Sequence, residues 1–463
     1  MSMPIPFPDM KPVMPELIMT GAAAALLVAE LVFRKKAVLG LFSILAAVAV
    51  FFVLSMSFGE TFNGMFISDA YSMQFKVIFL ITLILTVLLS LPYLRRERVE
   101  NGEYYSLLLF ATLGMMLMAS AKDLIIVYLG LELMALSTYI LAGIKKHDLK
   151  SNEAALKYFL LGSFSSALLL YGIALTYGLT TTTDLAAIAA QVGRGGTSPV
   201  LLLAMILIAS SFLFKIAAAP FHMWAPDVYE GAPTSVTAFM SVGPKAAGFA
   251  VIGRVFLTAF PSLQADWTAI LIGVAILSMA AGNILALAQT NIKRMLAYSS
   301  IAHAGYMLLG IIAGTQKGLS AVLTYLLIYA FMNMGAFAVV ILLDKGEEIK
   351  DYEGLARSHP LAAAAMLVFM FSLTGIPPTA GFIGKFTIFL AAVQAGHAWV
   401  VVIAVIFSAI SAYYYLRVVR NMYMRERAEA TALRPSWSLG LAICLTVLMV
   451  FIIGVMPSVV IGR

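Results

Sequence analysis

The sequence predicts an all-α membrane protein with about fourteen transmembrane helices, including two inverted five-helix repeats with proline-broken helices. Three observations lead to this fold class. Hydrophobic residues make up 62% of the 463 residues and charged residues 11%, with a mean hydropathy of +0.97, whereas soluble domains average about 45–50% apolar and about 25% charged. The apolar residues gather in runs of membrane-spanning length. Prolines and lysines recur at matching places in two parts of the chain.

The apolar runs are bounded by charged residues, proline or glycine, and a helix that crosses a bilayer needs about 20 such residues. In chain order the fourteen runs cover residues 17–33, 37–56, 75–93, 105–120, 124–143, 155–177, 200–224, 236–260, 267–289, 295–313, 319–343, 361–392, 399–419 and 437–456. Little sequence remains between them, so a soluble catalytic domain is excluded.

The loops between these runs differ in charge. If alternate loops lie on opposite sides of the membrane, one side carries nineteen Lys and Arg, and the other, with both termini, carries five. The nineteen are Arg34, Lys35, Lys36, Arg95, Arg96, Arg98, Lys145, Lys146, Lys150, Lys293, Arg294, Lys345, Lys350, Arg357, Arg417, Arg420, Arg425, Arg427 and Arg434, and the five are Lys11, Lys122, Arg194, Lys317 and Arg463. Because cytoplasmic loops collect Lys and Arg, we expect both termini outside. The net charge of +7 is then a topology signal, and nucleic acid is not an expected partner.

The sequence contains no motif for a redox centre or for a nucleotide-binding site. Cys444 is the one cysteine, which excludes a disulfide framework and any cysteine-ligated zinc or iron–sulfur site, because each needs several thiols. Neither a Gly-x-Gly-x-x-Gly turn after a strand nor a P-loop occurs. We therefore expect no cofactor site, no metal site and no NADH binding in this chain.

Four ionisable residues lie inside apolar runs: Glu132, Lys215, Lys245 and Lys385. A charge at a helix centre costs at least ~2.5–3.5 kcal/mol, so an intramembrane charge indicates a functional site by default. The alternatives are a polar anchor between helices for Glu132 and snorkelling toward an interface for the lysines.

Each of the three buried lysines has a proline nearby, and the pairs are Lys215 with Pro220, Lys245 with Pro244, and Lys385 with Pro377 and Pro378. Proline has no N–H to donate to the carbonyl four residues back. Four carbonyls therefore lose their helical donor, those of Ile216, Met240, Leu373 and Thr374. Unwound backbone at membrane depth is tolerated where it is buried in protein or lines a wet cavity, so we expect hydrated pockets around the lysines.

The proline and lysine pattern repeats. Counted from the fourth apolar run, the first block of five runs starts at the inner face and the next block starts at the outer face, and in both the fourth run combines a proline with a buried lysine. Inverted repeats with matching broken helices are typical of ion-translocating membrane folds. We expect an N-terminal segment with three flanking helices at 1–104, the first repeat at 105–260, the inverted repeat at 266–420, and a C-terminal loop with the last helix at 421–463.

Three stretches carry a resemblance to a known family. Residues 214–234 read FKIAAAPFHMWAPDVYEGAPT, residues 293–306 read KRMLAYSSIAHAGY and residues 373–386 read LTGIPPTAGFIGKF. They resemble the antiporter-like subunits of proton-pumping NADH:quinone oxidoreductase, respiratory complex I, and the resemblance covers nearly the whole chain. The chain looks most like subunit N. Residues 227–234, DVYEGAPT, have the form typical there, the long lateral helix of subunit L does not follow the last run, and Lys385 stands where subunit M typically has glutamate.

The resemblance implies that proton translocation uses the four buried charges already named, with Glu132 and Lys215 as an ion pair. Lys157 and His303 also match family positions, and His222 lies in the first motif, so these three are possible relays. The open alternatives are snorkelling for Lys157, a histidine satisfied by hydrogen bonds for His303, and a loop-facing side chain for His222.

The resemblance also implies a function: a proton-translocating membrane subunit that couples electron transfer from NADH to quinone, in other subunits, to proton pumping. NADH, FMN, iron–sulfur clusters and quinone would then belong to partner subunits, which include sibling antiporter-like subunits and small membrane subunits. The expected location is the inner (plasma) membrane of a bacterium, with both termini on the periplasmic side. The alternative is a subunit of a multisubunit cation/proton antiporter or of a membrane-bound hydrogenase, and the helix pattern does not separate the two.

Overall fold

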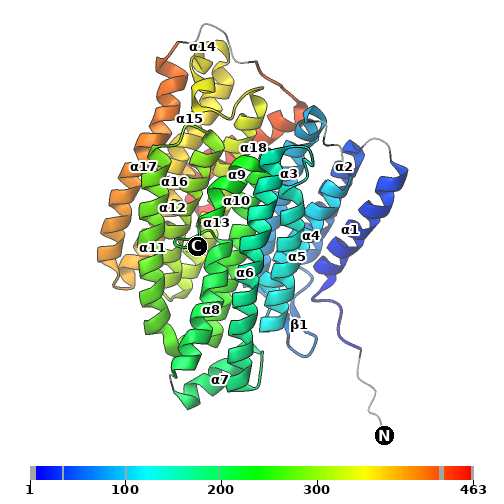
Figure 1. Ribbon diagram of the computed structural model, residues 1–463, viewed down its shortest axis with the longest axis vertical. Helices are drawn as coiled ribbons and strands as arrows, with labels where there is room; N and C mark the ends of the chain where they lie inside the picture. The colour runs from blue at the N-terminus through cyan, green and yellow to red at the C-terminus, as the bar shows by residue number, and fades with distance from the viewer. Residues whose placement is uncertain are drawn as a thin grey trace.

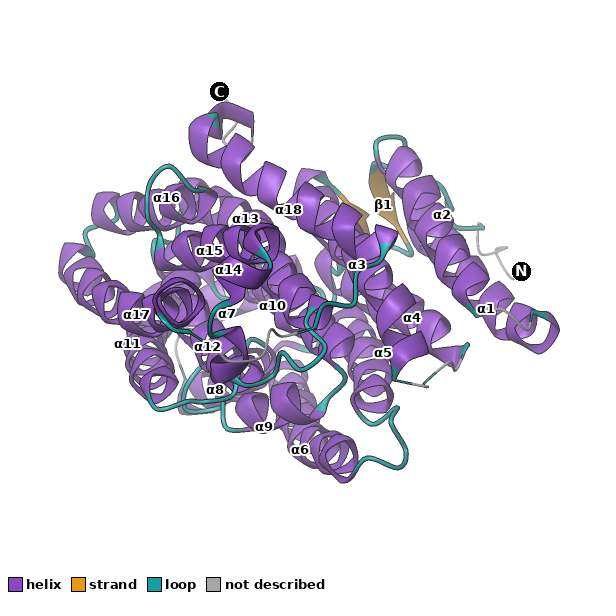
Figure 2. Cartoon of the chain, turned by 90° about the horizontal axis from the view of Figure 1, so that it is seen from above, coloured by secondary structure: helices purple, strands orange, loops and turns teal. Residues whose placement is uncertain are grey.

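The computed structural model describes residues 7–33, 36–97, 99, 102–196, 198–426 and 432–459. Long helices lie side by side in one bundle (Figure 1). Seen along the bundle, α1 and α2 form one edge and α11 and α17 lie toward the other (Figure 2). The all-α membrane fold is thereby confirmed.

Twelve helices within the described ranges are long and apolar enough to cross a membrane. They are α1 (Met14–Val32), α2 (Ala37–Leu54), α3 (Ala70–Arg96), α4 (Glu103–Ser120), α5 (Leu124–Ala142), α6 (Leu149–Thr180), α10 (Thr234–Ala259), α11 (Gln264–Leu287), α12 (Ile292–Ile312), α13 (Gln316–Leu342), α17 (Ala398–Met424) and α18 (Trp437–Val455). Three apolar helices are shorter: α8 (Pro199–Lys215), α15 (Pro360–Thr374) and α16 (Ala380–Gln394). The count of about fourteen crossings stays a prediction.

The short helices arise where the sequence predicts breaks. The predicted run at 200–224 ends as a helix at Lys215, and Ala217 then takes a left-handed conformation with φ of 55°. The run at 361–392 divides into α15 and α16 around Gly375, whose φ is 92°. By contrast, α10 continues through Pro244. Proline thus breaks two of the three lysine-bearing runs and leaves the third continuous.

Several small elements at the ends of the bundle have no counterpart in the sequence predictions. Strands β1 (Gly59–Thr61) and β2 (Phe66–Ser68) form an antiparallel hairpin in which Gly59 is opposite Ser68. Short helices α7 (Leu185–Gly195), α9 (Trp224–Gly231) and α14 (Leu355–Ser358) join longer ones, as do the 3₁₀ turns η1 (Pro261–Leu263) and η2 (Ile349–Tyr352), while η3 (Pro457–Val459) follows α18. Their apolar runs are too short for a pattern based on membrane-crossing length to detect.

The first two helices of each predicted repeat pack backbone against backbone. A Cβ added at Gly114 of α4 would lie 2.5 Å from the backbone nitrogen of Met134 in α5, and one at Gly282 of α11 would lie 2.5 Å from that of Ala302 in α12. Small residues allow such close approach between membrane helices. The two halves share this packing, although the predicted boundaries of the repeats stay a prediction.

Ion pairs join the loops at one end of the bundle, here called the basic end. Lys145 lies 2.7 Å from Glu97, and Lys150 lies 3.1 Å from Glu230. These contacts place several of the predicted cytoplasmic loops at the same end. Five cations used in the sequence count lie outside the described residues, namely Arg34, Lys35, Arg98, Arg427 and Arg463.

Candidate functional site

Helices α10, α12 and α13 lie in the interior of the bundle (Figure 2) and are buried along almost their whole length. A lysine on α10 therefore has no lipid to face. Lys215, Lys245 and Lys385 are 3%, 1% and 5% exposed, respectively. Their hydrogen-bond partners lie on α5, α12, α15 and α17 and on the residue that follows α8.

Lys215 is the last residue of α8 and lies among aromatic rings. Its Nζ donates to the hydroxyl of Tyr139 at 3.3 Å and lies 5.4 Å and 6.0 Å from the ring centroids of Tyr139 and Tyr158. Aromatic faces attract a cation electrostatically, more strongly where water is excluded. The position can therefore hold an ammonium without a carboxylate in direct contact.

Glu132 does not form the expected ion pair with Lys215. It lies on the outer face of α5, where Leu129 and Leu136 are 54% and 51% exposed, and its buried Oε1 has no hydrogen-bond partner in the part of the chain that the structure describes. The reason is the position along the axis of α5 at which Lys215 contacts that helix. Lys215 contacts Tyr139, seven residues from Glu132, and seven helical residues span about 10 Å. The structure thus shows no salt bridge between Glu132 and Lys215, and their pairing during function stays a prediction.

Lys245 lies on α10 and joins two other helices. Its Nζ donates to the carbonyl of Ile216 at 3.0 Å and to that of Ser300, in α12, at 2.7 Å. The Ile216 carbonyl is one of those that Pro220 deprives of a helical donor. The lysine amine thus replaces the missing backbone N–H.

Lys385 likewise supplies a hydrogen-bond donor at the break between α15 and α16. Its Nζ donates to the carbonyl of Thr374, at the end of α15, and to the hydroxyl of Ser408 in α17, both at 2.8 Å. It also lies 5.1 Å from the ring centroid of Tyr306. The Met240 carbonyl accepts from the Tyr229 hydroxyl instead, at 3.3 Å, so three of the four predicted carbonyls have side-chain donors.

His303 lies between these two lysines along α12. Its Nδ1 is 2.7 Å from the Tyr325 hydroxyl and its Nε2 is 3.1 Å from the Tyr415 hydroxyl, and Tyr415 also hydrogen-bonds Ser299. One turn further, the Tyr306 hydroxyl accepts from the Asn283 amide at 3.0 Å. A continuous polar face of α12 therefore runs from Ser300, next to Lys245, to Tyr306, next to Lys385.

Lys157 lies apart from these groups. Its side chain is 41% exposed and forms ion pairs with Glu153 and Asp227, each at 2.7 Å. Asp227 also pairs with Arg294 at 2.6 Å. Partial burial would raise the pKa of Asp227, but the hydrogen bonds from Lys157 and Arg294 outweigh it and hold that pKa below its usual value. These contacts tie α6, α9 and α12 together at the basic end.

His222 lies in the turn between α8 and α9 and is half-buried. Its Nδ1 is buried without a hydrogen-bond partner among the described residues. It forms no hydrogen bond with Lys215, Lys245 or Lys385.

Sequence reasoning missed a buried ion pair. Glu16 of α1 and Lys76 of α3 lie 2.7 Å apart, and their side chains are 3% and 0% exposed. Lys76 also lies 5.3 Å from the ring centroid of Phe66 in β2. Each residue lies near the end of its apolar run. A single charge at that place is usually interpreted as an anchor at the membrane–water interface. The signal that could have predicted this ion pair is the presence of opposite charges at the outer ends of two nearby apolar runs.

A second missed contact joins Asp69, the N-cap of α3, to Arg254 of α10. The guanidinium donates to both carboxylate oxygens, at 3.0 Å and 2.8 Å, and burial of Asp69 is outweighed by these hydrogen bonds, which lower its pKa. No group of three or more His, Cys, Asp or Glu side chains that could hold a metal ion occurs in the described ranges.

Residues 121–411 match the family model described as NADH:quinone oxidoreductase/Mrp antiporter, TM. The chain is 52% identical over 429 residues to NADH-quinone oxidoreductase subunit N of Trichlorobacter lovleyi, which covers 90% of this chain and 88% of that protein. It is 50% identical over 443 residues to subunit N 1 of Thermodesulfovibrio yellowstonii, with 96% of each chain covered. The chain belongs to the family of NADH-quinone oxidoreductase subunit N.

Solved structures agree with this membership. A chain of respiratory complex I from Thermus thermophilus with bound aureothin is 37% identical with a TM-score of 0.83, over 96% of this chain and 98% of that one. A chain of the Mrp complex from Dietzia sp. is 20% identical with a TM-score of 0.78, over 97% and 95% of the two chains, and this likeness shows the fold alone. All seven site residues predicted from the sequence fall within the range that the family model matches.

Proposed function

We propose that this chain is the proton-translocating membrane subunit of an NADH:quinone oxidoreductase, in which electron transfer in other subunits drives protons along Lys215, Lys245 and Lys385. Membership of the subunit N family supports the reaction. The observation that carries the route is the burial of three lysine amines on neighbouring polar groups, with no carboxylate within 4.0 Å of any of them among the described residues.

Lys245 and Lys385 have the right partners to take and release a proton. Each has two hydrogen-bond acceptors and no counterion. A neutral amine has two N–H groups, which these acceptors satisfy, and a lone pair that remains free to accept a proton. The ammonium keeps both hydrogen bonds but lies in a medium that penalises an unpaired charge. Both protonation states are therefore accessible at either lysine.

The face of α12 between them supplies groups that pass a proton on. His303 accepts at one ring nitrogen and donates at the other in its neutral form, and tyrosine hydroxyls lie on both sides of its ring. We place this histidine as a relay between Lys245 and Lys385, with water completing the path. Lys157 and His222 are not on this route.

Glu132 sets the proton affinity of Lys215 from a distance in this proposal. A carboxylate favours the ammonium form of a nearby lysine. Because Glu132 lies on the outer face of α5, a neighbouring subunit can move that helix face or supply a competing charge. Each proton moved against the membrane potential requires roughly 2.3 kcal/mol per 100 mV, and that energy comes from quinone reduction elsewhere in the complex.

The proposal places NADH, FMN, iron–sulfur clusters and quinone in partner subunits. It also places the basic end on the cytoplasmic side of a bacterial inner membrane and both termini on the periplasmic side, in keeping with the distribution of Lys and Arg. The antiporter alternative is not favoured, because the relatives at about 50% identity are named as subunits of the quinone reductase.

The test is proton pumping in the assembled complex. Lys215→Ala, Lys245→Ala and Lys385→Ala should each lower the number of protons pumped per NADH oxidised, with assembly checked by co-purification of the flavin-containing partners. Unchanged pumping per electron in all three variants would overturn the route. Purification with small membrane subunits alone, and without NADH oxidation, would favour the antiporter alternative.

A further inference from the structure

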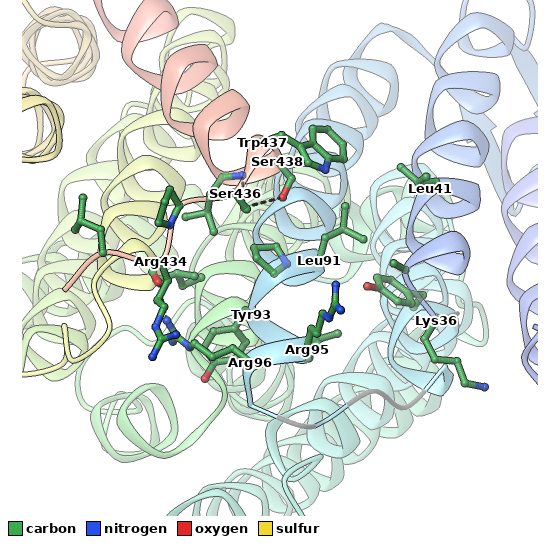
Figure 3. Close-up of a pocket in the computed structure, with 18 residues that line it drawn as sticks. Lys36, Leu41, Leu91, Tyr93, Arg95, Arg96, Arg434, Ser436, Trp437 and Ser438 are labelled. Atoms are coloured by element: carbon green, nitrogen blue, oxygen red, sulfur yellow. Dashed lines mark hydrogen bonds between the residues drawn. The ribbon is translucent and has the colours of Figure 1, made fainter. Parts of the chain in front are cut away.

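A cavity of about 670 Å³ opens at the basic end, between α2, α3 and α18. Four cations line it, Lys36, Arg95, Arg96 and Arg434, and no acidic residue is among its described lining residues. The rest of the lining is largely apolar. Figure 3 shows Leu91 and Arg95 of α3, together with Trp437 at the start of α18, around the same space.

The cations are not equally neutralised. Three of them have carboxylate partners outside the cavity: Lys36 pairs with Glu30 at 3.3 Å, Arg96 with Glu97 at 3.1 Å, and Arg434 with Asp344 at 2.9 Å. Arg95 is exposed and has no hydrogen-bond or ion-pair partner in the described part of the chain. Glu97 is shared with Lys145, which lies 2.7 Å from it, so the cluster keeps a net positive charge, and Arg95 is the cation of this set that has no carboxylate partner among the described residues.

The place of the cavity limits what can fill it. Helix α2 begins at Ala37, α3 ends at Arg96 and α18 begins at Trp437, so the cations stand where three membrane helices meet the surface of the bilayer. Trp437 and Leu41 are 66% and 44% exposed, and tryptophan is enriched at this depth. The cavity therefore has a basic rim toward the water and an apolar wall toward the lipid.

Two simpler explanations leave part of this arrangement unexplained. Cations in the last turn of α3 suit the helix dipole, and Lys and Arg are common on cytoplasmic loops. Neither explains why Arg434, from a distant part of the chain, joins them around one cavity whose described lining contains no carboxylate. Basic pockets between transmembrane helices bind anionic lipid headgroups.

We propose that this cavity binds one phospholipid molecule with a single net negative charge, its phosphodiester on Arg95 and one acyl chain along Leu41, Leu91 and Trp437. A zwitterionic lipid has the same phosphodiester, but its ammonium group faces the other cations of the rim. The site is separate from the proposed proton route, because none of its described lining residues hydrogen-bonds to Lys215, Lys245 or Lys385.

The test uses the assembled complex in vesicles of equal phosphatidylglycerol and phosphatidylcholine. A photoreactive amino acid replaces Leu41, and the captured lipid is identified by mass spectrometry. We expect phosphatidylglycerol to be captured about fivefold more than phosphatidylcholine, the ratio that about 1 kcal/mol per basic side chain near a membrane surface gives. Arg95→Gln should bring the ratio close to one. Arg95→Lys should preserve it, as should Lys146→Gln, which removes an exposed cation at the same end but outside the cavity.

Several results would overturn the assignment. Equal capture of the two lipids by the unmodified chain would remove the charge preference, and equal loss in Arg95→Gln and Arg95→Lys would show that charge is not its cause. Capture of a peptide from a neighbouring subunit alone would make the cavity a protein interface. Loss of the preference in excess inorganic phosphate would make it a general anion site.

Discussion

Lys245 can be a proton site or a polar link that holds α8 and α12 together, and replacing it separates the two roles. Lys245→Met removes the donor from two buried carbonyls, those of Ile216 and Ser300. The Ser300 carbonyl keeps its helical donor inside α12, whereas the Ile216 carbonyl is left unsatisfied, and one such group costs about 1–3 kcal/mol. A loss of pumping in this variant alone is therefore ambiguous, because the break after α8 is also destabilised.

Lys245→Arg resolves the ambiguity. A guanidinium can donate to both carbonyls, so it preserves the link. In water, however, an arginine holds its proton at least about a hundredfold more tightly than a lysine does. If Lys245 must release a proton in each cycle, Lys245→Arg should assemble normally and still lose most of its pumping.

The assay compares NADH oxidation with acidification of vesicles that contain the assembled complex. We expect Lys245→Met and Lys245→Arg to lower protons pumped per electron alike, although only the first lowers the thermal stability of the complex. Lys146→Arg, an exposed loop position without a side-chain partner among the described residues, serves as the matched control. Pumping at the wild-type ratio in assembled Lys245→Arg would refute the proton role and leave Lys245 as a structural link.

Three further predictions concern other charges. Glu132→Gln should slow NADH-driven pumping without reducing assembly, because the carboxylate makes no direct contact with Lys215, and wild-type rates would support a purely structural role. Glu16→Gln or Lys76→Met alone should cost about 3–5 kcal/mol by leaving a buried charge unpaired, whereas the double variant should recover most of the assembled complex; equal losses in all three would contradict this. Since its ion pairs lower the pKa of Asp227, they stabilise the fold at neutral pH and this contribution is lost as the pH falls through that pKa. Thermal stability should thus be lower in Asp227→Asn than in wild type at neutral pH, and the difference should begin to shrink below about pH 4 and disappear once the pH is below the lowered pKa of Asp227.

The sequence could predict the lysines and their surroundings because the cause is local. A lysine within an apolar run and a proline that frees a carbonyl are both visible within a few residues. The structure joins Lys385 to the freed carbonyl of Thr374 within the same predicted run. Lys245 reaches Ile216 from another helix, so the need for a donor was predictable and its identity was not.

The remaining contacts depend on how helices are placed against one another. Glu132 and Lys215 form no direct contact because packing sets the level at which α8 ends beside α5, and Lys215 contacts Tyr139, seven residues along α5 from Glu132. The pair of Glu16 and Lys76 was missed for the same reason, since nothing near either residue shows that α1 and α3 bring them within 2.7 Å. Hydrophobic runs predict the length and order of membrane helices. They do not predict how far each helix is shifted along the bundle axis relative to its neighbours.

The broken helices also explain why lysine, rather than a carboxylate pair, suits the inner part of the route. A carbonyl freed by proline is an acceptor without charge, so it can hold an amine in place in either protonation state. A carboxylate in its position would bind the ammonium far more strongly than the amine, and the proton would be released only when that pair was broken. At Lys245 and Lys385 the same backbone break that costs helical hydrogen bonds supplies the neutral acceptors that keep a lysine both buried and able to change its charge.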